Sequence, residues 1–208
     1  MGEAIGNMFP ARISAGTRTF PQLGFNRLII RKDGKARESW IGDEHYNVEN
    51  PERIPFGPVD PEVGVIKVED MQGNARAIVM SYAMHADLGC FSYEISADYP
   101  GYACRKVEEA FDNKAVCLFV AGGGGNVEGL MISRRRSGPN DPIKTDYKPI
   151  QRTGELLGIE VIKLANALHA SSDNTSFKMR TDSLQFSTRA DKNRKVNVHI
   201  ATFLINDF

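Results

Sequence analysis

The chain has 208 residues, of which 41% are hydrophobic, and its 26 basic and 26 acidic residues give a formal net charge of zero. This composition predicts a folded protein with a sizeable core and excludes a disordered tail. The balanced charge argues against a general nucleic-acid binder or an anionic-membrane binder, both of which normally carry a basic surplus.

The cysteine count and the apolar runs exclude further classes. Three cysteines, Cys90, Cys104 and Cys117, have no metal-type spacing, and reduced thiols are expected rather than a disulfide framework. No apolar run approaches the ~20 residues that a transmembrane helix needs. Residues 1–14 lack the basic region and the apolar region of a signal peptide.

Short strands and turns are expected in the first quarter of the chain. A strand is predicted at 11–15 and another at 26–31. The pair Asp33-Gly34 then favours a turn into a strand at 35–40, which gives a β-hairpin. Residues 42–61 are polar and rich in proline, and they are expected to form a long loop.

A strand–helix–strand unit is predicted in the centre of the chain. After a strand at 63–68, the apolar segment 75–83 is typical of a strand buried on both faces. Helical spacing of apolar residues predicts a helix from Asp98 to about 112, and residues 115–120 form a second continuous apolar strand. This order implies a parallel pair joined by a right-handed crossover.

The last third begins with a long loop at 121–149, followed by the clearest helix of the sequence at 150–170. Strands are predicted at 176–187 and 196–206. No turn or polar tail follows the second strand before Phe208, and we therefore expect that strand to be cut short. The predicted fold is therefore α/β, with a mixed sheet, a parallel β-α-β unit, flanking helices and β-hairpins. Residues 1–208 are interpreted as one incomplete domain.

Chemistry is expected where the two central strands end. Ligands of parallel sheets bind beyond the carboxyl ends of the strands, and both His85 and the run from Gly122 to Asn126 follow such ends. The crossover places both loops at the same edge of the sheet. His85 is a candidate metal ligand, although an isolated histidine at a strand end is more often structural.

The residues after His85 support either interpretation. Asp87, Glu94, Ser96 and Asp98 follow within one loop and can orient the imidazole. Alternatively, Ser96 and Asp98 only cap the following helix, and Asp98 is the predicted N-cap in both cases.

The glycine run also has two interpretations. The backbone N–H groups of Gly123, Gly124 and Gly125 can face an anion or an oxyanion, or the run forms a tight turn against close-packed backbone. A nucleotide site ranks last, because the lysine and the serine or threonine of a phosphate-binding loop are absent.

Several segments in a distinctive order resemble the catalytic domain of neutral/alkaline non-lysosomal ceramidases and their bacterial relatives. The similarity covers roughly residues 10–208. It rests on these segments: Phe25-Asn26-Arg27, GPVDPEVGVIKVED at 57–70, the strand leading to His85, ISADYPGYA at 95–103, and the apolar strand leading to Gly125-Asn126-Val127.

The resemblance implies a zinc-dependent amidase that cleaves the N-acyl bond of ceramide. His85 stands in the place of one of four zinc ligands, and Asn26 and Arg27 resemble a pair that lies near the substrate. Glu128 stands where such enzymes have a serine implicated in catalysis, and Asn126 stands where they have an aspartate. Many proteins of this family are secreted.

Two main hypotheses follow. The first is a zinc-dependent hydrolase of a small-molecule or lipid amide, with Glu128 as a candidate base and negligible activity in these 208 residues alone, because the other ligands of the family lie outside them. The second is a non-catalytic binding or scaffold module with the same fold.

Overall fold

The computed structural model describes residues 2–39, 50–89, 94–131, 134–135, 144–169, 177–188 and 190–205. The chain divides into two compact units, Met1–His169 and Ala170–Phe208, and each is described by itself. Two predicted loops, at 42–61 and 121–149, fall only partly within these residues. Trp40 and Asn206, which were predicted to end strands, lie outside them.

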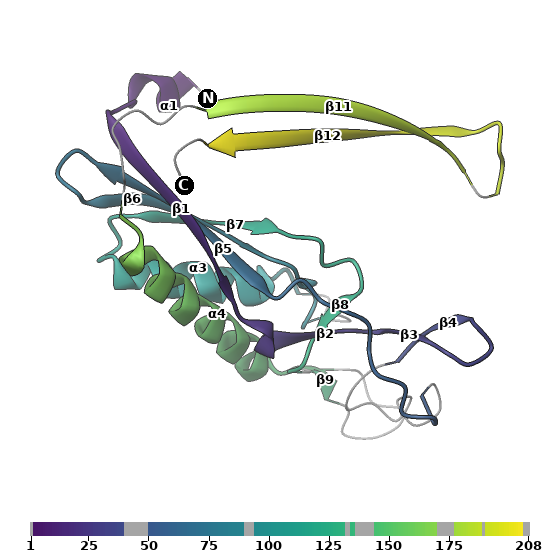
Figure 1. The fold of residues 1–208 in the computed structure, drawn as a ribbon. Coiled ribbons are helices and arrows are strands. Elements are labelled where there is room, and N and C mark those ends of the chain that lie inside the picture. Colours follow the sequence, from purple (N-terminus) through teal and green to yellow (C-terminus); the bar gives the residue numbers. More distant parts are fainter. Residues whose placement is uncertain are drawn as a thin grey trace. The chain divides into compact units, whose positions relative to one another are not determined.

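The first unit is built on a four-stranded mixed sheet (Figure 1). In spatial order its strands are β1 (Ala11–Thr19), β5 (Glu62–Asp70), β6 (Ala75–Tyr82) and β7 (Val116–Ala121). β5 pairs antiparallel with both β1 and β6, and β6 pairs parallel with β7. The predicted α/β class and its parallel β-α-β unit are thus confirmed.

Two helices cover one face of this sheet and bury the core (Figure 1). α3 (Asp98–Ala110) makes the crossover from β6 to β7, and α4 (Tyr147–Ala167) packs against α3. The two helices approach closely at Gly154, where a larger residue would not fit. A Cβ added to Gly154 would lie 2.4 Å from the carbonyl oxygen of Tyr99. The buried core side chains come from the inward face of the sheet and from both helices: Val63, Val65, Ile78, Met80, Tyr99, Val107, Leu157 and Val161.

The ends of α3 and α4 follow from local chemistry. Asp146 caps α4, and its carboxylate accepts a hydrogen bond from the Lys148 backbone N–H. α3 ends at Ala110, before Asp112 and Asn113, which both have positive φ angles of 54° and 57°. This left-handed backbone is unusual for residues other than glycine, but aspartate and asparagine tolerate it, and it terminates the helix.

Two small antiparallel ribbons lie beside the sheet. β2 (Gly24–Asn26) pairs with β8 (Val127–Gly129), and β3 (Leu28–Ile30) pairs with β4 (Ala36–Glu38). The single strand predicted at 26–31 is therefore two strands with different partners, and Arg27 lies between them. β8 lies inside the predicted loop 121–149, where its three residues are too few to give a recognisable period.

The remaining elements are short. α1 (Gly2–Gly6) precedes β1, and the 3₁₀ helix η1 (Pro21–Leu23) links β1 to β2. β9 (Arg134–Arg135) and β10 (Lys144–Thr145) form a further antiparallel ribbon. No helix among the described residues is long and apolar enough to cross a membrane.

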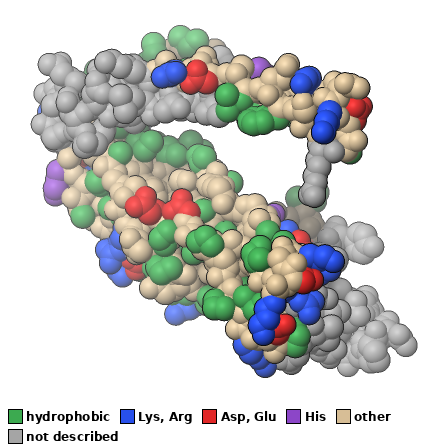
Figure 2. All heavy atoms as spheres, turned by 45° about the vertical axis from the view of Figure 1, so that its right-hand side comes forward, with side chains coloured by type: hydrophobic (Ala, Val, Ile, Leu, Met, Phe, Trp, Pro, Cys, Tyr) green, Lys and Arg blue, Asp and Glu red, His purple; other side chains and the backbone are tan. Residues whose placement is uncertain are grey.

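The second unit is a long hairpin of β11 (Phe177–Ser187) and β12 (Lys195–Ile205), which pair antiparallel along their full length. Its strands agree with the predicted segments to within one residue. Figure 2 shows that Lys and Arg side chains lie among Asp and Glu side chains on the visible surface, as the zero net charge suggests.

Candidate functional site

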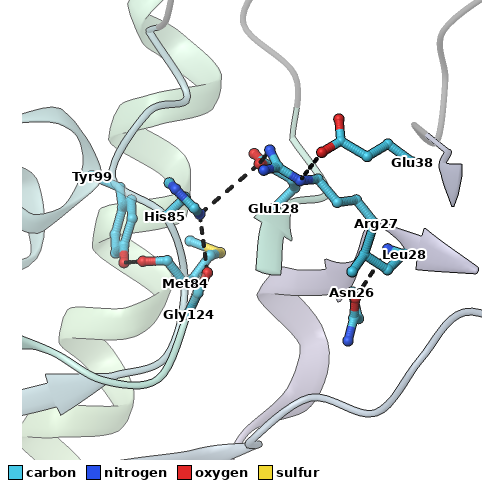
Figure 3. A network of polar contacts seen from close by, with 9 residues as sticks. All are labelled: Asn26, Arg27, Leu28, Glu38, Met84, His85, Tyr99, Gly124 and Glu128. Atoms are coloured by element: carbon cyan, nitrogen blue, oxygen red, sulfur yellow. Dashed lines mark hydrogen bonds and ion pairs between the residues drawn. The ribbon is translucent and has the colours of Figure 1, made fainter. Parts of the chain in front are cut away.

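The carboxyl ends of β6 and β7 bring the His85 loop and the glycine run together (Figure 3). The Gly122 N–H donates to the Tyr82 carbonyl at 3.0 Å, which continues the pairing one residue past the strands. The His85 Nδ1 atom then lies 3.0 Å from the Gly124 carbonyl oxygen. The two loops that were predicted to converge are thus in direct contact.

The glycine run has alternating surroundings. A Cβ on Gly124 would lie 2.7 Å from the Met84 backbone nitrogen, and one on Gly122 would lie 3.2 Å from the Ala83 backbone. The positions of Gly123 and Gly125 are open, with no atom within 4 Å. Close packing against backbone therefore explains Gly122 and Gly124, while Gly123 and Gly125 leave space for a ligand.

Glu128 is the buried acidic residue of the site. It lies on β8, opposite Phe25 of β2, and only 4% of the residue is exposed. Its Oε1 atom forms an ion pair with the Arg27 guanidinium and lies 4.0 Å from His85 Nδ1 (Figure 3). The pairing of β2 with β8 brings Arg27 and Glu128 together across 101 positions of sequence.

The environment raises the pKa of the Glu128 carboxyl above its ordinary value of 4.5. Burial is the largest cause, and the negative charge of Asp87 and a hydrogen bond with it act in the same direction. The positive charge of Arg27 and the interaction with His85 oppose this rise without cancelling it. The site therefore contains a carboxyl group that holds its proton more tightly than usual.

Arg27 is fixed by its backbone as well as by its side chain. Its N–H donates to the Asn126 carbonyl at 2.8 Å, and its carbonyl accepts from the Ser39 N–H at 2.7 Å. The guanidinium Nε lies 3.5 Å from Glu38 Oε1, so the side chain reaches two carboxylates. These contacts place Arg27 at the junction of both ribbons.

The predicted substrate-binding residue Asn26 makes structural contacts. Its Oδ1 accepts from the Leu28 N–H at 3.0 Å, and its Nδ2 donates to the Pro58 carbonyl at 2.8 Å. These bonds hold the chain where it passes from one ribbon to the next. Asn126, predicted to lie in the site, contributes its backbone carbonyl to Arg27, and the residue is exposed.

Asp98 and Ser96 organise the loop behind His85. α3 begins at Asp98, so the predicted N-cap residue is the first helical residue, and Ala97 occupies the cap position. The two Asp98 carboxylate oxygens accept from the N–H groups of Tyr99 and Gly89, both at 2.8 Å. The Asp98 N–H donates to Ser96 Oγ at 3.0 Å.

Tyr99 was not expected to contribute to the site. The fully buried tyrosine donates its hydroxyl proton to the Met84 carbonyl at 2.8 Å, directly before His85 (Figure 3). Burial raises the pKa of Tyr99, so it remains a donor at ordinary pH. Nothing in the local sequence pattern distinguishes this tyrosine from a core residue.

The environment of His85 suits one metal bond. A carbonyl oxygen only accepts hydrogen bonds, so the contact with Gly124 fixes the tautomer with the proton on Nδ1 and leaves the lone pair of Nε2 available. The side chain is 37% exposed. The orienting group is the Gly124 carbonyl rather than one of the carboxylates that follow His85 in sequence.

A zinc site needs more donors than this. Among the described residues, no group of three or more His, Cys, Asp and Glu side chains is arranged to hold a metal ion. A catalytic zinc requires three protein ligands besides water. The described residues therefore supply one candidate ligand, and they do not form a zinc site by themselves.

Comparisons with known proteins identify the fold. No family model matches the chain, and no curated protein matches it. The crystal structure of neutral ceramidase from Pseudomonas aeruginosa matches with a TM-score of 0.57 and 15% identity, over 94% of this chain and 30% of that one. A ceramidase complexed with C2 matches with a TM-score of 0.55 and 14% identity, over 95% of this chain and 29% of that one.

At these identities the likeness establishes a shared fold. The chain spans less than a third of the length of either ceramidase. A shared fold does not by itself establish a shared function, which depends on the residues of the site.

Proposed function

We propose that this chain carries part of the active site of a ceramidase-like hydrolase that cleaves N-acyl amide bonds of lipid-type substrates. The observation that carries the proposal is the meeting of His85, Glu128 and Arg27 at one sheet edge. It is supported by the match to two ceramidases over 94% and 95% of the chain.

Glu128 is the proposed general base. A base works best when its pKa lies near the operating pH, and burial moves the Glu128 pKa upward in that direction. The ion pair with Arg27 holds the carboxylate in one position. Glu128 would accept a proton from the water that attacks the amide carbonyl.

The glycine run is proposed to face the carbonyl oxygen of the substrate. The open positions at Gly123 and Gly125 allow a substrate to approach the backbone closely. Asn126 follows directly and is exposed, so it can contact the same ligand. Asn26 and Arg27 are proposed to support this surface from the neighbouring ribbon.

His85 is proposed as one zinc ligand, in agreement with the resemblance noted in the sequence. When bound, zinc would polarise the amide carbonyl and acidify a bound water. The natural reading frame offers an inexpensive check on the remaining ligands. A His-x-His segment upstream and a glutamate-bearing segment downstream would favour the zinc hydrolase.

A binding experiment tests the site itself. The 208-residue chain is titrated with a soluble short-chain N-acylsphingosine while the imidazole signals are followed by NMR. We expect saturable binding that shifts the His85 signals and is weakened at least tenfold by His85→Gln. His169→Gln is the matched control, because His169 is an exposed histidine of the same unit. Binding that is unchanged by both His85→Gln and Glu128→Gln would rule out this site.

A non-catalytic binding module is the second candidate function. It is favoured by the ion-paired Glu128 at the position where the resembled enzymes have a serine, and by the single candidate metal ligand. Release of fatty acid that depends on Glu128, measured on a chain extended in its natural reading frame, separates the two. Saturable binding without release would favour the module.

A further inference from the structure

The two faces of the β11–β12 hairpin have opposite chemistry toward its tip. Residues that pair across the strands lie on the same face, and the face alternates from one position to the next. One face carries three polar contacts between side chains of the two strands. These contacts join Ser183 to His199, Gln185 to Asn197 and Ser187 to Lys195, at 2.8, 3.1 and 2.8 Å. The polar side chains of this face are therefore paired within the hairpin itself.

The opposite face of the same segment is apolar. It carries two cross-strand pairs, which we call the apolar patch: Leu184 with Val198, and Phe186 with Val196. All four residues are 40–53% exposed. Figure 2 shows apolar side chains on one side of this hairpin and Lys and Arg side chains toward its tip. Large apolar residues that cluster on a surface in this way indicate a contact site.

The tip beside the apolar patch is basic. Residues 191–195 contain three basic side chains and one acidic side chain. The Thr188 N–H donates to the Arg194 carbonyl at 2.9 Å, which continues the strand pairing one position past β12. Arg194 is two positions before Val196, so it belongs to the face of the apolar patch. The patch and a positive charge thus share one face of the hairpin.

The hairpin needs a partner for this face. A two-stranded hairpin is marginally stable at best in water, and a third strand or a helix normally covers its apolar side. The described residues of the second unit form β11, β12 and the turn between them, with no third element. A partner that covers the apolar patch would therefore stabilise the hairpin.

We propose that the β11–β12 hairpin docks onto an anionic lipid surface, with the apolar patch inserted at the headgroup boundary and the basic tip on the phosphate groups. Charge complementarity selects this partner, because apolar side chains flanked by Lys and Arg are typical of segments that bind anionic membrane interfaces. The whole chain has no net charge, so the attraction is local to the tip. The proposal goes beyond the hydrolase function and does not rest on it.

Vesicle sedimentation tests the proposal. The 208-residue chain is mixed with phosphatidylcholine vesicles, with and without phosphatidylserine, at several salt concentrations. We expect saturable binding to the phosphatidylserine vesicles that weakens as salt rises, and little binding to phosphatidylcholine alone.

Two double variants separate the charge from the apolar contact. Lys192→Gln with Arg194→Gln should weaken binding by roughly tenfold, because two positive charges near the anionic surface are lost. Phe186→Thr with Val196→Thr should weaken it by roughly as much, and threonine keeps a preference for strands. The matched control is Lys148→Gln with Arg152→Gln, which removes two exposed charges from α4 and should leave binding unchanged.

A fluorescence measurement reports on the patch directly. In Phe186→Trp, the emission should move to shorter wavelength when phosphatidylserine vesicles are added, because the indole enters an apolar environment. The unmodified chain is the comparison, since its one tryptophan is Trp40.

Several results would overturn the proposal. These are a folded chain that does not bind phosphatidylserine vesicles, binding that both hairpin variants retain, or an equal loss in the α4 control. Without vesicle binding, a patch-dependent dimer in light scattering would assign the patch to a second copy. In the same case, a large loss of stability in Phe186→Thr with Val196→Thr would assign it to packing within the protein. Binding to duplex DNA instead of vesicles would assign the basic tip to nucleic acid.

Discussion

His85 and Glu128 approach to 4.0 Å, yet their surroundings are opposite. The Glu128 side chain is 5% exposed and is held by Arg27, whereas the His85 side chain is 37% exposed and is held by one carbonyl oxygen. The comparison shows that the carboxylate is part of the packed structure and the imidazole is at its surface. Substitutions around Glu128 should therefore change stability more than a substitution of His85 does.

The largest effect is expected when the partner of Glu128 is removed. Arg27→Met leaves a buried carboxylate without its positive partner, and such losses cost about 3–5 kcal/mol. The free energy of unfolding in urea at neutral pH measures this change. Adding Glu128→Gln to Arg27→Met should restore most of the lost stability, because no buried charge then remains. If the double variant is as unstable as the single one, Arg27 acts through packing instead.

The same carboxyl predicts a pH dependence. The pKa of Glu128 is raised in the folded state, so the folded protein binds a proton more tightly than the unfolded chain. Its contribution to the free energy of unfolding becomes less favourable as pH rises above the ordinary value of 4.5, until the folded-state pKa is passed. Glu128→Gln should remove this decline, and unfolding curves of both proteins across that range compare them directly. A decline of equal size in the variant would contradict the assignment to Glu128.

A smaller loss of stability is expected from a substitution at Gly124, in the loop between β7 and β8 that contacts His85. Gly124→Ala places a Cβ 2.7 Å from the Met84 backbone nitrogen, so backbone must move, at a cost of about 1–3 kcal/mol. Gly123→Ala is the matched control, because its Cβ would meet no atom within 4 Å. Chemical denaturation measures both changes, and NMR of the His85 imidazole shows whether the Gly124 carbonyl has moved. Equal losses for the two variants would argue against close packing as the reason for Gly124.

The sheet edge was predictable from the sequence because it follows from periodicity and topology. The apolar segments around 75–83 and 115–120, with one helix between them, require a parallel pair, and His85 and the glycines necessarily follow its ends. The contact between His85 and Gly124 is a direct consequence of that order.

The partners of Glu128 were not predictable in the same way. Arg27 reaches Glu128 through the pairing of β2 with β8, two strands of three residues each that carry no usable period. The hydroxyl of Tyr99 likewise reaches Met84 only through the packing of α3 below the sheet. Such contacts depend on tertiary structure, which the local pattern does not contain.

The smallest change in stability is expected at His85. His85→Ala removes one hydrogen bond from a partly exposed side chain, and the loss should stay below about 1 kcal/mol. Zinc titration calorimetry should show weak binding to the 208-residue chain, because one imidazole is a single donor, and the variant should lose it. His169→Ala controls for adventitious binding at an exposed histidine of the same unit. Tight stoichiometric zinc that survives His85→Ala would place the metal elsewhere, and a large loss of stability would show that the fold depends on the His85 side chain.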